Sequence, residues 1–210
     1  MIKVLIVEDD PMASKLLEIY INQSEKYVHA HSLESAAMAE LYCLKNPIDL
    51  ILMDVCTAMD ANGLDAAAKI KKLFPKIKII IITSQPEFSF LERARNAGVE
   101  SFWYKSASAQ EILEVMDRTM AGESVYPDKT PSLKVGEALN ADFTDKELEI
   151  LREVINGESD AEIAEKLHLS LRTVKWHIQN MRDKTGFRNR TELAVKARVS
   201  GMVIDDRKTE

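Results

Sequence analysis

The sequence has few cysteines and no long apolar run. Its two cysteines, Cys43 and Cys56, lack C-x-x-C spacing, and no histidines stand where they would complete a metal site with them. We therefore expect two free thiols in a reducing cytosol. No stretch approaches the length of a membrane span, and the apolar run in MIKVLIVEDD is too short for a signal peptide. These absences argue against a disulfide scaffold and a membrane protein, and they predict a cytoplasmic chain.

Charge is distributed unevenly along the 210 residues. The overall net charge of −6 argues, taken alone, against a nucleic-acid partner. However, residues 137–165 hold ten acidic and two basic side chains, a net charge of −8, whereas residues 166–198 hold nine basic and two acidic ones, a net charge of +7. The second stretch can therefore bind a polyanion.

The first part of the chain, to about residue 122, alternates strand-like and helical patterns. Such alternation predicts βαβ units and a doubly wound parallel sheet. Ser32 and Ser108 are placed to cap the helices that follow them, the second in a Ser-x-x-Glu capping box with Glu111. The expected strands are residues 2–7, 27–30, 49–53, 78–83 and 101–104, and the expected helices are residues 11–22, 33–45, 63–74, 88–97 and 109–121.

The second part of the chain contains no strand-like run. Residues 123–141 have two prolines, one glycine and no sustained periodicity, so we interpret them as a linker. Beyond them, three helices begin with capping boxes or their Asn variant, and a fourth is opened by Ser170. The pattern predicts an α/β domain at 1–122 and a four-helix domain at 142–210. The capping pairs are Thr144 with Glu147, Ser159 with Glu162, and Asn189 with Glu192.

Polar side chains gather where the predicted strands end, and the carboxyl ends of parallel strands meet at one edge of a sheet. Carboxylates that lie close together repel one another unless a cation lies among them. Oxygen ligands from Glu8, Asp9 and Asp54 suit Mg²⁺. Asp54 can then attack a phosphoryl donor and form an aspartyl phosphate, with Lys105 pairing with the phosphate and Thr83 donating a hydrogen bond. The alternative is that these acids only cap helices or face solvent. That alternative would explain one acid at a strand end, but it explains less well why four strand ends carry acids, a hydroxyl and a lysine.

Four short motifs resemble bacterial two-component response regulators of the NarL/FixJ subfamily, in which a receiver domain precedes a LuxR-type helix-turn-helix. They are VEDDPM, LMDV, IITSQ and FWYKS. The resemblance implies a five-stranded sheet of order 2-1-3-4-5, an acidic pair at Glu8 and Asp9, and a phosphoacceptor at Asp54. It further implies that Thr83 is a switch hydroxyl and that Lys105 binds the phosphate. Phe102 would be the aromatic switch residue, and the backbone carbonyl of Cys56 would be a further ligand for Mg²⁺.

The chain departs from the family pattern at three places. The usual Met-Pro is missing from DVCTAMDANG, and Gly63 lies nine positions after Asp54 where eight is usual. Ser106 follows Lys105 where many receivers have proline, and Phe102 lacks a tyrosine hydroxyl. None of these departures removes a group that the chemistry requires.

The motif TVKWHIQNM resembles the recognition helix of LuxR-type domains. Val174, Ile178 and Met181 form an apolar stripe at helical spacing, and polar and aromatic groups lie opposite. That face can bind phosphates and read base edges in a major groove, or it can be an ordinary solvated face. The last helix, residues 190–200, commonly supplies a dimer contact in this family, although a core role is nearly as well supported. The expected DNA contacts are Arg172, Thr173, Lys175, Trp176 and Gln179.

These patterns favour a transcriptional regulator rather than an enzyme. A sensor histidine kinase would phosphorylate Asp54, and the phosphorylated protein would bind promoter DNA as a homodimer. A phosphatase with an aspartyl-phosphate intermediate usually carries a second acid two residues after the nucleophile, where this chain has Cys56 and so no proton donor. The third hypothesis, suggested by the unusual loop after Asp54, is a regulator that acts without phosphorylation.

Overall fold

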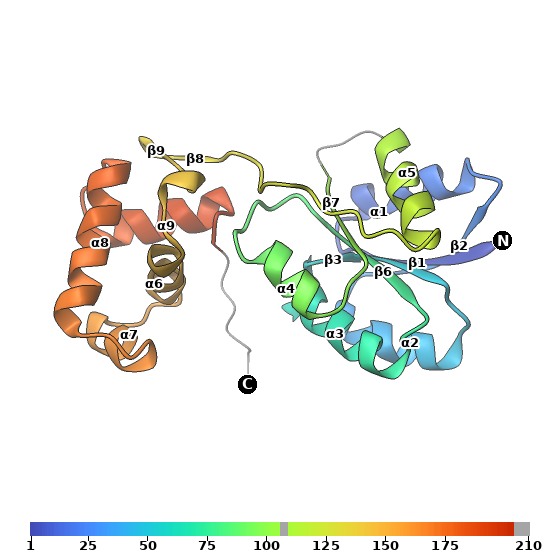
Figure 1. Cartoon of the computed structure of the whole chain (residues 1–210), viewed down its shortest axis with the longest axis horizontal. Helices are drawn as coiled ribbons and strands as arrows, with labels where there is room; N and C mark the ends of the chain where they lie inside the picture. The colour runs from blue at the N-terminus through green and yellow to red at the C-terminus, as the bar shows by residue number, and fades with distance from the viewer. Residues whose placement is uncertain (106–108, 204–210) are drawn as a thin grey trace. The chain divides into compact units, whose positions relative to one another are not determined.

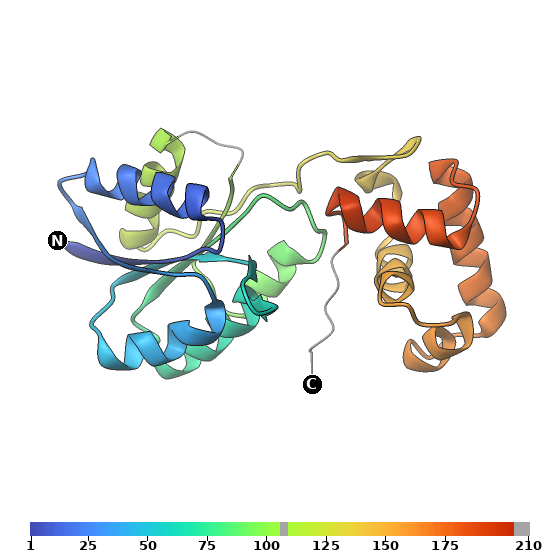
Figure 2. The ribbon, with the colours of Figure 1, turned by 180° about the vertical axis from the view of Figure 1, so that it is seen from behind.

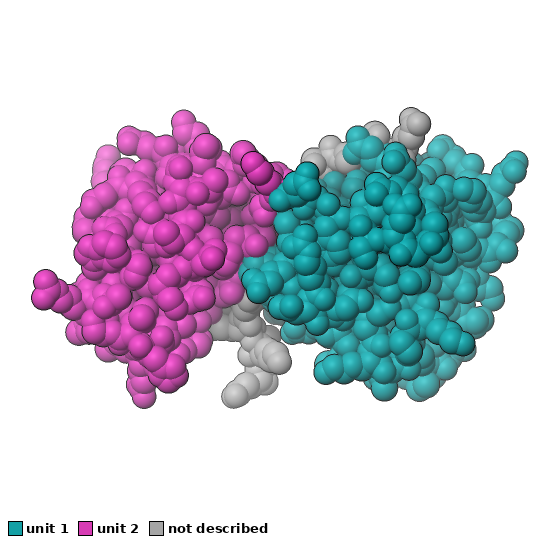
Figure 3. All heavy atoms as spheres, viewed as in Figure 1, with its two compact units in different colours: residues 1–84, 89–128 teal, residues 85–88, 129–210 magenta. Residues whose placement is uncertain are grey.

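The computed structural model describes residues 1–105 and 109–203, which form two compact units (Figure 3). Each unit has its own hydrophobic core. None of the helices in the described part of the chain is long and apolar enough to cross a membrane. The first unit consists of residues 1–84 and 89–128, and the second consists of residues 85–88 together with the chain from residue 129 onward.

The first unit is built on a five-stranded parallel sheet of order β2-β1-β3-β6-β7 (Figure 1). This is the predicted order, since β4 and β5 form a separate hairpin. The central strands are apolar along their length because helices cover both faces of the sheet, and every residue of β3 is buried. The strands are β1 (Ile2–Val7), β2 (Tyr27–Leu33), β3 (Leu50–Asp54), β6 (Lys78–Thr83) and β7 (Ser101–Tyr104).

Helices α1 and α5 cover one face of this sheet, and α2, α3 and α4 cover the other (Figures 1 and 2). On the first face, side chains of α1 and α5 such as Leu17 and Met116 pack with alternate strand residues such as Ile6 and Ile80 in one buried cluster. The sheet is therefore the middle of three layers. The helical segments are α1 (Pro11–Asn22), the 3₁₀ turn η1 (Ala36–Met38), α2 (Ala39–Lys45), α3 (Gly63–Leu73), α4 (Phe90–Asn96) and α5 (Ala109–Met120).

The prediction that Ser32 caps a helix is wrong. The pairing of β1 with β2 shifts register by one residue between Val4 and Leu5, and β2 continues to Leu33, so Ser32 lies inside the strand. The following turn η1 is capped instead by Ser35, whose side chain accepts a hydrogen bond from the amide of Ala37. The second expected cap, Ser108, lies outside the described residues.

The loop after Asp54 is an ordered hairpin, which the sequence analysis does not predict. Strands β4 (Cys56–Thr57) and β5 (Ala61–Asn62) pair antiparallel, and Met59 and Asp60 at the tip have left-handed φ angles of 63° and 50°. The buried hydroxyl of Thr57 donates to the carbonyl of Ala61 at 2.7 Å and accepts from the amide of Ala36 at 2.9 Å. The hairpin accommodates the extra residue of this loop.

The second unit contains the four predicted helices. The capping boxes at Thr144 and Ser159 are confirmed, and the side chains of Ser170 and Asn189 cap the other two helices. Where the sequence indicates an irregular segment, residues 134–142 form a short hairpin and a 3₁₀ turn. The elements are β8 (Lys134–Val135), β9 (Ala138–Leu139), η2 (Asn140–Asp142), α6 (Asp145–Ile155), α7 (Asp160–Lys166), α8 (Leu171–Thr185) and α9 (Arg190–Ser200).

The apolar stripes of the helices meet in the core of this unit. Val174 and Met181 of α8 are fully buried, and Ile178 is nearly so, as predicted. Leu193 and Ala197 of α9 are also fully buried in the same core. The apolar face that the sequence offers for a dimer contact is therefore used within the domain.

Candidate functional site

Four strands of the first unit deliver polar side chains to the carboxyl edge of the sheet. Glu8 directly follows β1, Asp54 ends β3, Thr83 ends β6, and Lys105 directly follows β7. Neighbouring strands are in register here, since Asp54 is opposite Ile82, and Thr83 is opposite Tyr104. Parallel pairing therefore brings together residues that lie far apart in the sequence.

Lys105 joins two carboxylates at this edge. Its ammonium nitrogen lies 2.7 Å from Oδ2 of Asp54 and 2.5 Å from Oε2 of Glu8. Both acids are almost completely buried, and the backbone amide of Val55 donates to the other oxygen of Asp54 at 2.7 Å. One oxygen of Asp54 thus faces the lysine, and the other is held by the start of the next loop.

Asp54 and Lys105 each shift the pKa of the other. Burial raises the pKa of Asp54 to about 7, against the opposing attraction of Lys105, and the charge of Glu8 raises it further. Burial alone would lower the pKa of Lys105, but its contacts with Asp54 and Glu8 outweigh burial and raise it. Burial thus acts against the charged form of Asp54, and the contact with Lys105 acts in its favour.

Asp9 completes an acidic cluster with Glu8 and Asp54. One carboxylate oxygen from each lies within 4.8 Å of the others, and Asp9 is exposed. With all groups ionised, three carboxylates face the single ammonium of Lys105, which leaves two negative charges uncompensated among these residues. A cluster of hard oxygen donors with surplus negative charge fits a hard divalent cation.

The backbone passes very close to Asp54 at Gly63. A Cβ atom added to Gly63 would lie 1.8 Å from the carbonyl oxygen of Asp54, and no side chain fits in that space. The amide of Gly63 also donates to the carbonyl of Val55 at 2.8 Å, which closes the loop that contains the hairpin. Gly63 thus lies against the backbone of Asp54 itself.

Three further residues predicted for this site, Thr83, Phe102 and Cys56, belong to β6, β7 and β4 respectively. Thr83 is buried, and its carbonyl accepts from the amide of Lys105 at 2.9 Å. Phe102 is buried in β7 and contacts the rings of Tyr104 and Tyr126, with centroid separations of 5.0 and 6.3 Å. Cys56 is half-buried at the start of β4. Ser106, where the family often has proline, lies outside the described residues.

In the second unit, α8 presents the predicted polar face opposite its core stripe. Arg172, Lys175 and Gln179 are exposed, as is 59% of Trp176, an unusually large aromatic surface for solvent. Thr173 is half-buried, and its amide and hydroxyl both bond to the capping hydroxyl of Ser170. Four of the five predicted DNA-binding residues therefore share an open face, and Thr173 also belongs to the cap of the helix.

Two further polar contacts in this unit are absent from the sequence prediction. The ammonium of Lys184 lies 2.7 Å from Oε2 of the buried Glu147, whose contacts with Lys184 and Thr144 outweigh burial and lower its pKa. On the exposed face, Gln179 bonds to both Arg182 and Asp183. The i, i+3 and i, i+4 spacings within α8 are a signal that reveals the second contact, whereas the first joins residues 37 positions apart.

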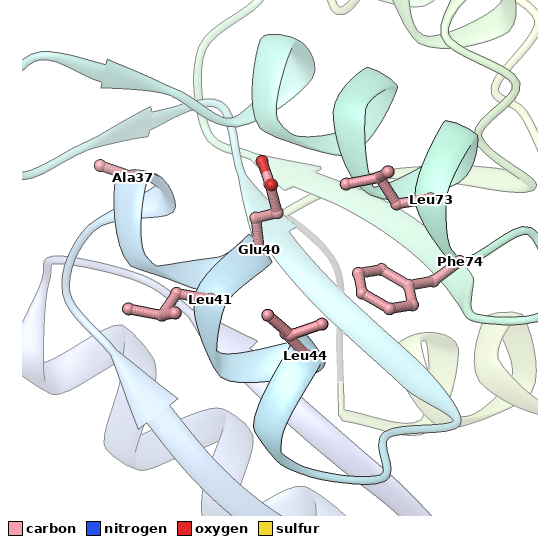
Figure 4. A pocket seen from close by; sticks show the side chains of 6 residues that line it. All are labelled: Ala37, Glu40, Leu41, Leu44, Leu73 and Phe74. Carbon is pink, nitrogen blue, oxygen red and sulfur yellow. The ribbon is translucent and has the colours of Figure 1, made fainter.

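A hollow between α2 and the end of α3 lies outside this chemistry (Figure 4). Leu41, Leu44, Leu73 and Phe74 make most of its lining, and Glu40 is the one ionisable residue among the described residues that form it. The hollow is therefore mostly apolar, and none of the residues predicted for the phosphorylation site lines it.

A doubly wound sheet with a lysine-bridged acid cluster, followed by a capped helix-turn-helix, defines proteins that join a receiver domain to a DNA-binding domain. Residues 4–117 match the family model of the response regulator receiver domain, and residues 141–197 match that of bacterial regulatory proteins of the luxR family. The chain is 34% identical over 203 residues to the response regulator protein VraR of Staphylococcus aureus, covering 93% of this chain and 96% of that protein. It belongs to the response regulators with a LuxR-type DNA-binding domain.

Solved structures agree with this fold. A structure of Salmonella typhimurium RcsB, a response regulator, matches with a TM-score of 0.61 at 20% identity, covering 93% of this chain and 98% of that one. A structure of two RcsB dimers bound to two parallel DNAs matches with a TM-score of 0.64 at 20% identity. The match covers 93% of this chain and 96% of that one. The protein is a DNA-binding response regulator of a two-component system.

Proposed function

We propose that Asp54 is the phosphoacceptor through which a partner sensor histidine kinase controls DNA binding. The observation that carries this proposal is the ammonium of Lys105, held 2.7 Å from Asp54 and 2.5 Å from Glu8. An oxygen of Asp54 attacks phosphorus, the bond from phosphorus to the donor breaks, and the donor leaves with the electron pair. Lys105 then pairs with the new phosphoryl oxygens, and the hydroxyl of Thr83 donates a hydrogen bond to them.

Mg²⁺ is the cofactor that this donor set suits. Glu8, Asp9 and Asp54 would hold it, with the backbone carbonyl of Cys56 as a further ligand. When bound, the ion neutralises negative charge on the transferred phosphoryl group. The chain supplies the nucleophile and its counter-charges but no general acid two residues after Asp54, which supports a regulator rather than an enzyme with a turnover reaction.

Phosphorylation would act by rearranging the switch residues. A dianion at Asp54 draws the hydroxyl of Thr83 toward it, and the vacated space lets Phe102 repack. We propose that this repacking favours a homodimer that binds promoter DNA, in the cytoplasm where that DNA lies. The likeness to RcsB, whose dimers are seen on DNA, supports the dimer. We keep the domain boundaries at 1–122 and 142–210 as a proposal, although residues 129–141 group with the second compact unit and Val135 and Ala138 are buried in its core.

The decisive experiment is phosphorylation of the full chain with acetyl phosphate and Mg²⁺. We expect one phosphoryl group per chain, labile to base, on Asp54 and no group on the Asp54→Asn variant. Asp65→Asn, which changes an exposed acid in the first turn of α3, is the matched control and should be phosphorylated like the wild type. Sedimentation with beryllofluoride, which mimics the acyl phosphate, should show a dimer. Wild-type labelling of Asp54→Asn would disprove the assignment.

We propose that α8 enters the major groove and contacts DNA through Arg172, Thr173, Lys175, Trp176 and Gln179. Changing Gln179 to Ala should cost roughly 1–3 kcal/mol on the preferred duplex while binding to a scrambled duplex barely changes, because an amide reads base edges. Lys175→Ala is the contrasting variant. It should weaken both duplexes and reduce the log–log salt slope by about one, because a lysine binds phosphates. Titration of the full chain with a duplex selected from a random library measures both, and equal losses for Gln179→Ala on both duplexes would contradict base reading.

A further inference from the structure

The side chain of Gln179 has two partners on its own helix. Its amide nitrogen donates to Oδ1 of Asp183 at 2.7 Å, and its amide oxygen accepts from a guanidinium nitrogen of Arg182 at 3.0 Å. A carboxylate only accepts hydrogen bonds and a guanidinium only donates them. These two partners therefore determine which end of the amide is oxygen and which is nitrogen.

One of these partners is itself held by the backbone. A second guanidinium nitrogen of Arg182 donates to the carbonyl of Arg188, beyond the end of α8, and Arg182 is half-buried. The oxygen end of the Gln179 amide is thus fixed to an anchored group. The other end depends on Asp183, which is exposed and lies on the same side of α8 as Gln179.

Asp183 is the one acidic residue of α8, in a segment with a net charge of +7. A carboxylate on this face repels DNA phosphates, so it lowers the affinity for every duplex alike. The presence of Asp183 is therefore not explained by a gain in DNA affinity. A contribution to sequence selectivity is consistent with the contact between Asp183 and Gln179.

We propose that Asp183 is a positioning residue that sets the base preference of Gln179. The amide has two N–H donors and two acceptor lone pairs, and its two partners use one of each. One donor and one acceptor remain, and these are the groups that the major-groove edge of adenine requires, with its N7 acceptor and N6 donor. Asp183 thereby orients Gln179 toward an A·T pair. This inference rests on the proposed role of Gln179 as a base reader.

The experiment compares four variants of the full chain on the selected duplex and a scrambled one. They are Asp183→Ala, Asp183→Asn, Gln179→Ala and the Asp183→Ala/Gln179→Ala double variant. Asp183→Ala should reduce the ratio of specific to scrambled affinity about fivefold, roughly the value of one net hydrogen bond. Asp183→Asn keeps an acceptor without the charge, so it should retain the ratio while binding both duplexes more tightly. In the Gln179→Ala background, Asp183→Ala should change the ratio by less than about twofold, because the two residues act together.

Glu149→Gln is the matched control, since it removes one partly exposed acidic charge, paired with Lys146, from α6 and should leave the ratio unchanged. Replacing each A·T pair of the selected duplex with G·C should reveal one position at which the wild type discriminates and Asp183→Ala does not. Equal behaviour of Asp183→Ala and Asp183→Asn would overturn the inference in favour of plain charge repulsion. A loss that persists without Gln179 would also overturn it, because Asp183 would then contact a base directly. If Gln179→Ala itself keeps the wild-type ratio, the proposed base reader fails as well, whereas failure of Asp183 alone leaves that proposal intact.

Discussion

Replacing Gly63 with alanine should almost abolish phosphorylation of Asp54. The new Cβ would lie 1.8 Å from the carbonyl oxygen of Asp54, and no side-chain rotation can separate them, because the backbone sets the positions of both atoms. The strand end or the start of α3 must therefore shift by an ångström or more. A displacement of that size at a reacting group lowers a rate by about 100-fold. Forcing an extra carbon into packed structure also costs about 1–3 kcal/mol of unfolding free energy.

Gly98→Ala is the control for this substitution. Gly98 has a φ of +75°, but a Cβ added there would meet no atom within 4 Å, so alanine costs backbone strain without a collision. We expect about 1 kcal/mol of destabilisation and a normal rate of labelling by acetyl phosphate. Chemical denaturation and phosphate incorporation, measured on both variants, separate the two effects. A Gly63→Ala variant that is labelled as fast as Gly98→Ala would show that the close approach is unimportant.

Lys105→Met should lower the rate of Asp54 phosphorylation by about 100-fold or more, comparable to removing one donor from an oxyanion site. Methionine matches much of the length of the lysine stem but supplies no charge and no hydrogen-bond donor. Glu8 and Asp54, both nearly buried, would then lose the ammonium that lies within 2.7 Å of each. The transferred phosphoryl group would lose its counter-charge in the same way.

The matched control is Lys78→Met, at the other end of the sheet. Lys78 lies 3.4 Å from Glu100, which keeps Lys71 at 2.6 Å when Lys78 is changed. This variant should be labelled normally, with a stability change of about 1 kcal/mol, because the pair is long and Glu100 keeps its closer partner Lys71. The measurement is the initial rate of phosphate incorporation at fixed Mg²⁺ and acetyl phosphate. Equal rates for the two lysine variants would exclude a direct role of Lys105.

The acid cluster at the edge of the sheet follows from the sequence, whereas the order of the strands follows from the resemblance to response regulators. The runs that become β3 and β6 are apolar at nearly every position, as strands covered on both faces must be, and their ends carry Asp54 and Thr83. Once β3 and β6 are neighbours in a parallel sheet, these ends have to lie side by side. The position of Lys105 against Asp54 and Glu8 is therefore predictable from residues far apart in the chain.

Other contacts leave no sequence signal that periodicity can detect. The strands β4 and β5 have two residues each, too few to show alternation. Met59 is an unusual residue for a left-handed turn, although Asp60 is a common one. The extension of β2 past Ser32 accompanies a shift of the register by one residue, which does not change the composition. The pairing of Glu147 with Lys184 arises only when α6 and α8 pack together.

The hydrogen bond between Gly63 and Val55 closes the base of the loop after Asp54 and separates the tip of the loop from the carboxylate of Asp54. The amide of Gly63 donates to the carbonyl of Val55 at 2.8 Å, and the hydroxyl of Thr57 accepts a hydrogen bond from the amide of Ala36. Both ends of the hairpin are therefore held in place. The conformation of the tip, Met59 and Asp60, is therefore separated from the position of the acid. The side chain of Met59, 71% exposed at this tip, is accordingly a suitable attachment point for a fluorescent or spin label that reports on this edge of the sheet from outside it.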